Sequence, residues 1–432
     1  MSSASTQQDF SPHLSVAIIG AGPAGLSLAL QAACALPTAR ITVFDARPAE
    51  KDVASDPRTL ALSLGTVQEL QRMGVWDAIQ SSGQTAPIQQ VHVSQQQPTV
   101  LWPVRHQPEV LITAAEQGVP QLGAVVSYGT LVAPLQQRWL EATLAAPHRL
   151  AMRFGTAVRG IKPRPDGVEV DADIAEAFDL AVVAEGGVFS DQPKLHWPEG
   201  ISRDYKQSAW VGTVLLSANS PAGVAYERFT PSGPAALLPL PAGSLKLGGP
   251  SGPRAALVWC VQQDDDPVRD LNDAQRRTVL NSLFHPQVGE IVDVSPLKNF
   301  PLGLNAHRRL VTEGHVVRIG NAAQTLHPVA GQGLNLGMRD VHELLSALKD
   351  TQPGPLTTPE QKNAWIGTGL ARFERRRQPD RFALLATTDF LARSFTYPAP
   401  ILATVRGLGL GAVGAIAPLK KLIAHSMMFG WR

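Results

Sequence analysis

Two glycine-rich segments, about 300 residues apart, constrain this chain of 432 residues more than any other feature. The first reads Gly20-Ala-Gly-Pro-Ala-Gly25, and the second reads Gly320-Asn-Ala-Ala-Gln-Thr-Leu-His-Pro-Val-Ala-Gly-Gln-Gly-Leu-Asn335. Either segment alone would be modest evidence, because glycine-rich turns serve many structures. Together they predict two walls of one extended dinucleotide site, the first at a diphosphate and the second under the ring of a redox cofactor.

The first segment stands in the context that a dinucleotide-binding turn requires. An apolar, β-branched run over 14–19 predicts a buried parallel strand, and the alanine-rich stretch 26–35 predicts a helix. Between them, Gly20 allows the tight turn, Gly22 lets the backbone approach a diphosphate, and Gly25 permits close packing of helix on strand. The N-terminus of the helix adds N–H donors and a positive dipole end.

A second predicted strand, 40–44, ends at Asp45, where a ribose-binding carboxylate belongs. The alternative is an ordinary turn followed by a solvated acid. Because strand, glycines, helix, second strand and acid follow in order, the dinucleotide interpretation is favoured. The same glycine spacing recurs over 409–414, but no acidic residue follows it. We interpret that match as close helix packing or a membrane-facing surface, not as a separate NAD(P)H domain.

Composition and charge limit the function classes. A net charge of +2 argues against a strongly charged nucleic-acid binder, so no nucleic-acid partner is expected. Cys34 and Cys260 lack metal-ligand spacing, and the acidic run 264–266 has no companion ligands, so no metal is expected. We expect both thiols to be reduced and buried. Because the N-terminus also lacks a basic and apolar signal, a cytoplasmic location is expected.

The length of the chain suits two or three interleaved units. The pattern predicts an α/β protein: a Rossmann-like nucleotide domain, an inserted antiparallel β-sheet that forms a substrate domain, and C-terminal helices. The expected ranges are a disordered lead-in over 1–12, the nucleotide domain over 13–87, 127–195 and 301–350, the substrate domain over 88–126 and 196–300, and the helical region over 351–432.

The C-terminal region is basic and apolar. No Asp or Glu follows Asp389, whereas Arg393, Arg406, Lys420 and Lys421 all lie beyond it. No stretch is long and apolar enough for a confident transmembrane helix. Such a tail could lie on an anionic membrane surface or cover a partner protein. The alternative is an ordinary packing helix with a few surface lysines, and both interpretations stay open.

At these residues the chain resembles the class A flavoprotein aromatic hydroxylases, the group of para-hydroxybenzoate hydroxylase, and within it the ubiquinone-biosynthesis branch known as UbiH/UbiF/VisC. The resemblance covers nearly the whole chain after the first dozen residues. It is most specific at 20–25, 56–58, 226–230, 237–240 and 320–340. Asn321 and Gln324 stand where most members have Asp and His. In this respect the local sequence resembles that of the UbiH subgroup, the 2-polyprenyl-6-methoxyphenol hydroxylases.

The resemblance implies a non-covalent FAD held by both glycine segments. The diphosphate would lie at Gly20, Gly22 and Gly25, and the adenosine ribose at Asp45. The other implied contacts are Arg58 and Gln136 flanking the cofactor, Glu185 where the family usually has Asp, Asn321 at the ribityl chain, Pro328 beside the flavin ring, Gly331 and Gly333 in the same loop, and the N–H groups of Leu334 and Asn335 at the N1 and O2 edge.

The resemblance also implies the reaction. NAD(P)H, a transient co-substrate, would reduce FAD, O2 would add to give a flavin hydroperoxide, and its distal oxygen would pass to a polyprenylated phenol. No side chain need act as a nucleophile, and His327 is the one catalytic candidate, unless it only packs against proline and shapes the loop. Two other functions stay open: a reductase or dehydrogenase of a prenylated substrate, and a non-catalytic FAD-binding scaffold in a lipid-biosynthesis complex. Peripheral contact with a membrane or with complex partners would suit such a substrate.

Overall fold

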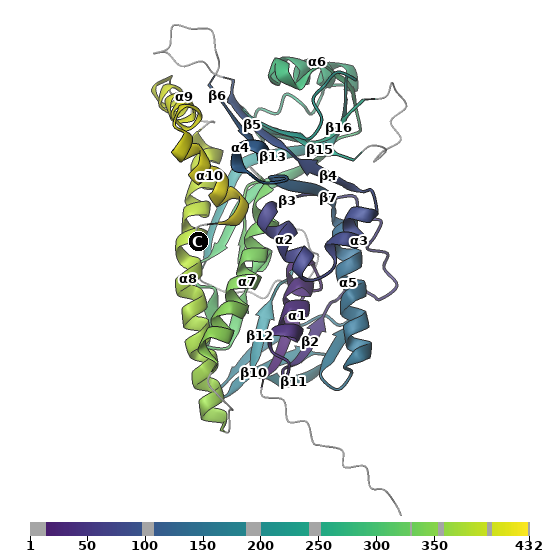
Figure 1. Ribbon diagram of the computed structural model, residues 1–432, viewed down its shortest axis with the longest axis vertical. Helices are drawn as coiled ribbons and strands as arrows, with labels where there is room; N and C mark the ends of the chain where they lie inside the picture. Colours follow the sequence, from purple (N-terminus) through teal and green to yellow (C-terminus); the bar gives the residue numbers. More distant parts are fainter. Residues whose placement is uncertain are drawn as a thin grey trace, which may run out of the picture.

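The computed structural model describes residues 14–96, 108–186, 200–241, 252–328, 331–352, 358–394 and 400–430. The expected lead-in over 1–12 lies outside these residues. Two layered units stack along the long axis of the molecule, and helix α8 (Pro359–Ser394) runs beside both of them (Figure 1). The parallel sheet, the inserted sheet and the C-terminal helices expected from the sequence are all present.

The first unit is built on a six-stranded sheet with the order β19-β20-β12-β1-β2-β8. Neighbouring strands are parallel except at the β19–β20 edge. The strands are β1 (Ser15–Ile19), β2 (Arg40–Phe44), β8 (Leu150–Arg153), β12 (Leu180–Val183), β19 (Val311–Thr312) and β20 (Val316–Arg318). Because these strands come from four distant parts of the chain, the unit is discontinuous in sequence.

Both faces of this sheet are covered, which explains why β1 reads as one apolar run. Val16 and Ile18 pack on the helical side, whereas Ala17 and Ile19 pack on the opposite side. The helical layer contains α1 (Pro23–Ala35), α2 (Leu64–Arg72), α3 (Trp76–Ser81), α5 (Tyr128–Ala145) and α7 (Gly333–Thr351). The opposite layer is a three-stranded antiparallel sheet of β9 (Gly160–Arg164), β10 (Gly167–Ala172) and β11 (Ile174–Phe178).

The second unit is built on a nine-stranded sheet. The path of the sheet is β21-β18-β13-β16-β15-β14-β5-β6, and β17 pairs with β13 beside it. Helix α6 (Asp273–Leu283) covers part of one face. The strands are β5 (Gln90–Gln95), β6 (Glu109–Thr113), β13 (Gly200–Leu216), β14 (Val224–Thr230), β15 (Gly233–Leu240), β16 (Arg254–Gln262), β17 (Ile291–Val294), β18 (Lys298–His307) and β21 (Gln324–Thr325).

The second unit differs from the expected substrate domain in three ways. First, the sheet is not wholly antiparallel, because β5 pairs with β14 in parallel. Second, β4 (Thr85–Ile88) and β7 (Gly123–Ser127) leave it to form a small antiparallel sheet with β3 (Thr59–Ser63). Third, β18 crosses the expected boundary at residue 300, because it continues to pair with the long strand β13 as far as His307.

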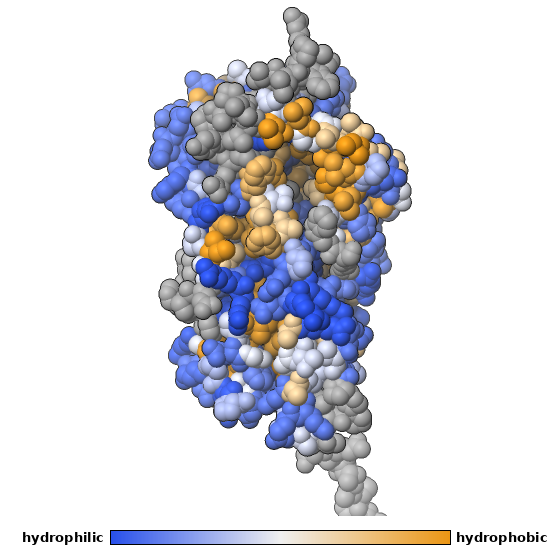
Figure 2. Space-filling view, turned by 90° about the vertical axis from the view of Figure 1, so that its left-hand side faces the viewer, coloured by the Kyte–Doolittle hydropathy of each residue, from blue (hydrophilic) through white to orange (hydrophobic). Residues whose placement is uncertain are grey.

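The C-terminal region continues from α8 into α9 (Pro400–Ala415) and α10 (Ala417–Phe429). Together with α8 these helices form one side of the molecule, and Figure 2 shows hydrophobic side chains gathered on the upper half of that side. The short elements are α4 (Ala114–Gln117), η1 (Pro286–Val288) and η2 (Gly320–Ala322).

The two cysteines differ from each other in burial. Cys260 is buried in β16, and burial raises the pKa of its thiol. Cys34 is exposed, so the expectation that both thiols are buried was wrong. The reason is geometric, because Cys34 lies at the C-terminal end of α1 on a position that the sheet does not cover.

Candidate cofactor site and active site

The first glycine segment connects β1 to α1. Gly20 has a φ of +105°, and a Cβ on it would lie 3.0 Å from the carbonyl group of Ala184. A Cβ on Gly25 would lie 1.9 Å from the carbonyl oxygen of Gly20. The fold itself therefore requires these two glycines.

Gly22 is different, because a Cβ there would meet only the hydroxyl of Tyr128, at 3.5 Å. Gly22 is also the N-cap of α1, and it provides no side chain to cap the helix. The first N–H groups of α1 therefore remain available to an external acceptor. Open space beside an uncapped helix N-terminus fits an anionic diphosphate.

Asp45 lies where the sequence predicted, at the end of β2. Its Oδ2 accepts a hydrogen bond from the backbone N–H of Ala21 at 2.7 Å, and its Oδ1 accepts one from the N–H of Arg47 at 2.9 Å. The guanidinium of Arg47 donates to Gln136 Oε1 at 3.2 Å. Arg47 thus joins the expected ribose ligand to the expected flanking residue Gln136. Sequence reasoning missed Arg47, although its place two residues after the acid was a usable signal.

Glu185 follows β12 and lies beside the same turn, since a Cβ on Gly20 would be 3.0 Å from the Cα of Glu185. Burial, together with the negative charge of Asp45, raises the pKa of Glu185 from 4.5 to about 7. The side chain is therefore about half protonated at neutral pH. A second anion at this turn would favour the protonated form further.

Arg58 is more exposed than a residue that flanks the cofactor would need to be. Its guanidinium forms an ion pair with Asp56 at 2.8 Å and lies 4.1 Å from the centre of the Tyr128 ring. The Tyr128 hydroxyl is the nearest atom to a side chain at Gly22. Arg58 therefore lies behind Tyr128 as seen from Gly22, and its contact with the cofactor stays a prediction.

The second glycine segment is held by a buried carboxylate that sequence reasoning missed. Gly320 has a φ of +58°, and its N–H donates to Asp340 Oδ2 at 2.9 Å. The side-chain amide of Gln324 donates to the same oxygen at 3.2 Å. Asp340 is fully buried on α7, and its Oδ1 accepts from Arg377 Nε at 2.8 Å. An acid on an otherwise apolar helix face was the available signal.

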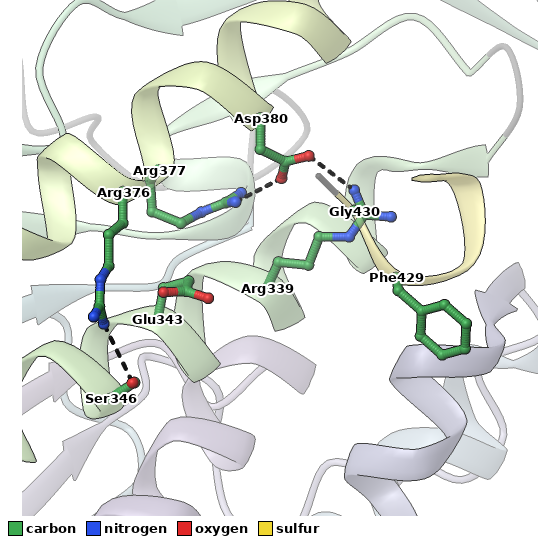
Figure 3. A pocket seen from close by; sticks show the side chains of 8 residues that line it. All are labelled: Arg339, Glu343, Ser346, Arg376, Arg377, Asp380, Phe429 and Gly430. Carbon is green, nitrogen blue, oxygen red and sulfur yellow. Dashed lines mark hydrogen bonds and ion pairs between the residues drawn. The ribbon is translucent and has the colours of Figure 1, made fainter. Parts of the chain in front are cut away.

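A cavity of about 320 Å³ lies behind α7 (Figure 3). Side chains of α7 and α8, together with Phe429 and Gly430, line this cavity, and none of its lining residues belongs to either glycine segment. The cavity is therefore separate from the expected cofactor position.

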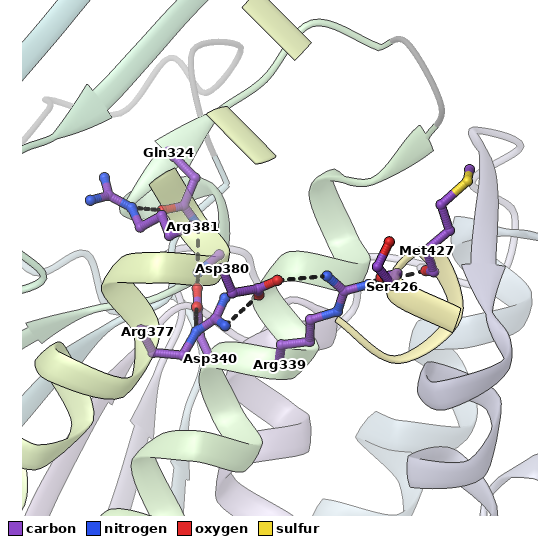
Figure 4. A network of polar contacts seen from close by, with 9 residues as sticks. Gln324, Arg339, Asp340, Arg377, Asp380, Arg381, Ser426 and Met427 are labelled. Carbon is purple, nitrogen blue, oxygen red and sulfur yellow. Dashed lines mark hydrogen bonds and ion pairs between the residues drawn. The ribbon is translucent and has the colours of Figure 1, made fainter. Parts of the chain in front are cut away.

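Beside that cavity, an ion-pair network extends from Asp340 across three helices (Figure 4). Arg377 Nη1 donates to Asp380 at 2.6 Å, and Asp380 pairs with Arg339 at 3.4 Å. Arg339 in turn donates to the carbonyl oxygens of Ser426 and Met427, at 3.2 and 3.0 Å. The network locks α7, α8 and α10 to the second glycine segment.

The two glycine segments are adjacent in space. A Cβ on Gly320 would lie 3.5 Å from the Cβ of Ala24 and 3.6 Å from the Cα of Gly337. Ala24 belongs to the first segment, and Gly337 lies one turn into α7. Small residues at all three positions allow η2, α1 and α7 to meet closely.

Helix α7 begins at Gly333, within the second segment. Its N-cap, Gln332, forms no side-chain cap, so the first N–H groups of α7, including that of Leu334, can bind an acceptor. Asn321 lies beside this helix start, since a Cβ on Gly333 would be 3.8 Å from its Oδ1, and it is exposed. Gly331, with a φ of +59°, packs closely on Ala61.

The side chain of Asn335 is fully engaged within the protein. Its Oδ1 accepts from the Ser63 N–H and the Thr66 hydroxyl, both at 2.8 Å, and its Nδ2 donates to the Ala61 carbonyl at 3.0 Å. Only the backbone of Asn335 remains for a ligand. This fits the expectation that backbone N–H groups face the edge of the cofactor ring.

His327 connects the second segment to the nine-stranded sheet. Its Nε2 lies 3.0 Å from Gln207 Oε1 on β13, and its ring meets the edge of Tyr205 at 5.4 Å between centroids. Burial lowers the pKa of His327 to about 4. The imidazole is therefore neutral at physiological pH, which favours a positioning role over proton transfer. Pro328 is half-buried, and 329–330 lie outside the described residues.

Among the described residues, His92, Glu109 and His285 form one group with the spacing of metal ligands. The Nε2 atoms of His92 and His285 lie 2.9 and 3.5 Å from the same oxygen of Glu109. The Nδ1 of His285 accepts a hydrogen bond from the Gln287 N–H at 3.3 Å, which leaves its proton on Nε2. We therefore interpret the group as a hydrogen-bonded cluster. The absence of a metal stays a prediction.

Comparisons with known proteins extend these observations. A family model described as "FAD binding domain" matches residues 13–176 and 218–354. The chain is 31% identical over 422 residues to ubiquinone hydroxylase UbiL of Rhodospirillum rubrum, covering 96% of this chain and 89% of that protein. It is 29% identical over 416 residues to 3-demethoxyubiquinol 3-hydroxylase of Escherichia coli, covering 94% of this chain and 96% of that protein.

Solved structures share the fold at low sequence identity. Klebsiella pneumoniae HpxO, solved with FAD and uric acid, superposes with a TM-score of 0.66 at 17% identity, over 98% of both chains. Pseudomonas aeruginosa PqsL, described as a probable FAD-dependent monooxygenase, also gives a TM-score of 0.66 at 17% identity, over 92% of this chain and 99% of that chain.

Proposed function

Because this chain belongs to the FAD-binding family of flavoprotein monooxygenases, as an enzyme of the UbiH/UbiF/VisC type, we propose that it hydroxylates a polyprenylated phenol in ubiquinone biosynthesis. The family confirms the expected enzyme class and FAD as the cofactor. The two relatives named above are a ubiquinone hydroxylase and a 3-demethoxyubiquinol 3-hydroxylase by name. Assignment to the UbiH subgroup stays a prediction.

One observation carries the proposal: two uncapped helix N-termini, α1 at Gly22 and α7 at Gln332, belong to glycine segments that pack on each other. A dinucleotide with a diphosphate at one position and an electron-accepting ring at the other needs donors at both. The residues present therefore fit FAD.

The residues of the chain divide the work of holding that cofactor. Backbone N–H groups at the start of α1 would bind the diphosphate, and Asp45, fixed by Arg47, would bind the ribose. N–H groups at the start of α7 would face the part of the ring that becomes negative on reduction. Bound FAD supplies hydride acceptance and oxygen activation, and the protein supplies orientation and exclusion of water.

The overall reaction balances with one reductant. One oxygen atom of O2 enters a C–H position of the phenol, and the other leaves as water, with NAD(P)H supplying two electrons. His327 stands where the second segment meets the nine-stranded sheet. We place the phenol ring there, with the neutral imidazole, held by Gln207, orienting its polar group.

A turnover experiment tests the proposal. Purified protein with FAD is mixed with NADH or NADPH and a short-chain prenylphenol, and flavin reduction and O2 uptake are followed. We expect the phenol to accelerate flavin reduction and to be hydroxylated with one NAD(P)H and one O2 consumed per product. Reduction of the prenylated compound without O2 uptake would support the reductase alternative instead. Retained FAD without turnover of any phenol would support the scaffold.

A further inference from the structure

The corner formed by α9 and α10 exposes an unusual number of large apolar side chains. Their exposed fractions lie between 43% and 58%, for Leu408, Ile416, Leu422 and Val405. Phe382 and Phe390 of α8 are also exposed, at 74% and 58%. Figure 2 shows hydrophobic side chains gathered on the upper part of the side that these helices form. Large apolar patches on a protein surface mark interaction sites.

The inner faces of the same two helices are already packed. Ala424 and Met428 of α10 are buried in the core cluster beneath, and Leu410 and Val413 of α9 pack against it. A Cβ on Gly414 would lie 3.4 Å from the backbone oxygen of Glu109 on the edge strand β6. The helices are therefore held in place by one face, which leaves the outer face available.

The basic residues of this region do not all face the solvent. Arg406 is buried, and Lys420 binds the carbonyl oxygen of Leu111 and the carboxylate of Glu116, both at 2.9 Å. Lys421 is exposed. Of Arg406, Lys420 and Lys421, only Lys421 is therefore exposed beside the apolar side chains.

We propose that the outer face of the α9–α10 corner docks on a lipid bilayer by inserting its apolar side chains into the interface. In the described part of the chain, no single helix meets the length and hydropathy expected of a membrane span, whereas 404–415 and 417–429 meet them only as a pair bent by 97°. A bent apolar pair attached along one face suits shallow insertion rather than crossing.

Charge favours a bilayer over a protein partner. No Asp or Glu occurs in the sequence after Asp389. The carboxylate that contacts α10, that of Glu116, is paired with Lys420, which reduces its repulsion of anionic headgroups. The proposal rests partly on the proposed function, because a polyprenylated substrate resides in the bilayer. The exposed apolar side chains support it independently of any substrate.

Liposome flotation of the FAD-loaded protein tests the proposal without substrate. The corner variant carries Leu408→Glu, Ile416→Glu and Leu422→Glu. The matched control carries Leu144→Glu and Ile174→Glu, two apolar residues that are 81% and 72% exposed in the first unit. We expect wild type and control to float with phosphatidylcholine–phosphatidylglycerol vesicles. The vesicle affinity of the corner variant should be lower by a factor of about ten or more. Pure phosphatidylcholine should lower wild-type binding about five-fold, the effect of one lysine.

FAD absorbance and circular dichroism check that each variant is folded. If the corner variant does not fold, a double variant with the milder substitutions Ile416→Ser and Leu422→Ser replaces it. Wild type that stays in the soluble fraction, or a corner variant that floats like wild type, would overturn the proposal. So would a wild-type dimer that the corner variant converts to monomers without any vesicle binding, because a second copy would then cover the face. Failure to hydroxylate any phenol would instead count against the proposed function alone.

Discussion

Gly22 and Gly25 show how two glycines of one motif serve different purposes. A side chain at Gly25 would collide with backbone 1.9 Å away, whereas one at Gly22 would meet only a hydroxyl at 3.5 Å. The backbone at Gly22, with φ −80° and ψ −176°, is also open to any residue. Gly25 is thus required for folding. The fold does not require glycine at position 22, which fits the proposed contact of its backbone with a ligand.

This difference yields the first prediction. Gly22→Val should fold, with the apo protein losing about 1 kcal/mol or less of stability, but it should not retain FAD, because the valine fills the space of the diphosphate. Gly25→Ala, the matched control, should fold poorly with or without FAD. Absorbance at the flavin band and thermal unfolding of the apo proteins measure the two effects. Full FAD occupancy of Gly22→Val would contradict the assignment of the first segment.

Glu185 makes cofactor binding depend on pH. Its pKa of about 7, raised by burial and by Asp45, means that it loses its proton within the physiological range. FAD affinity should then fall as pH rises from 6 to 8, because the new charge faces the diphosphate, and Glu185→Gln should flatten this dependence. Titration of apo protein with FAD at each pH measures it. Parallel pH profiles for wild type and variant would exclude this role of Glu185.

The raised pKa of Glu185 also determines how the stability of the FAD-free protein changes with pH. The unfolded chain loses the Glu185 proton near 4.5, whereas the folded protein keeps it to about 7. Between these values the folded state binds more protons, so the contribution of Glu185 to stability declines as pH rises through that window.

The sequence was sufficient to identify residues within a local motif. It was not sufficient to identify residues that tertiary structure brings next to that motif. Asp45 and the first three glycines could be predicted, because the strand–turn–helix order fixes their relation. Arg47 was missed although it follows Asp45 by two residues, whereas Gln207 could not be predicted, because its partner His327 comes from an element distant in sequence. A match to a family motif also does not show how exposed a matching side chain is, as the exposed side chain of Arg58 illustrates.

At the scale of elements, α7 is central to the second segment. Its N-terminus faces the expected cofactor ring, its Gly337 packs on η2, and its Asp340 binds the first N–H of that segment. The contact of a buried acid on this helix with a loop twenty residues earlier depends on the tertiary fold, so the sequence alone did not show it.

Removing that anchor gives the third prediction. Asp340→Asn should lower the free energy of unfolding by about 3 kcal/mol, because Arg377 would lose a buried partner. FAD affinity should fall as well, because the amide has one acceptor oxygen, so its NH2 group would face either Arg377 or the N–H of Gly320. Asp350→Asn, on the same helix, weakens only partly exposed pairs with Arg372 and Arg376 and should cost less than about 1 kcal/mol. Denaturant unfolding and FAD titration measure both. Equal losses for the two variants would contradict the account.

The pairing of strands was the element-scale feature least accessible from sequence. The sequence pattern predicted an inserted antiparallel sheet, but within this sheet β5 lies parallel to β14. Alternation specifies which face a strand buries, and it says nothing of the strand's neighbour or direction.

At the scale of the whole molecule, the three sites that we propose lie in order along the structure. The first unit and α7 carry the proposed cofactor site, and His327 connects its second glycine segment to the nine-stranded sheet. Beyond this sheet, α9 covers its edge strand β6 and carries the apolar corner (Figure 1). A water-insoluble phenol would therefore pass from a bilayer at one end toward the flavin at the centre.

We propose that this chain, with FAD held between its two glycine segments, hydroxylates a phenol with one oxygen atom of O2. Turnover of a short-chain prenylphenol under 18O2 in unlabelled water, followed by mass spectrometry of the product, tests this proposal. We expect a product heavier by one 18O atom, formed by wild type and absent with FAD-free Gly22→Val. A product without 18O, or an equal yield of labelled product from the variant lacking FAD, would contradict it.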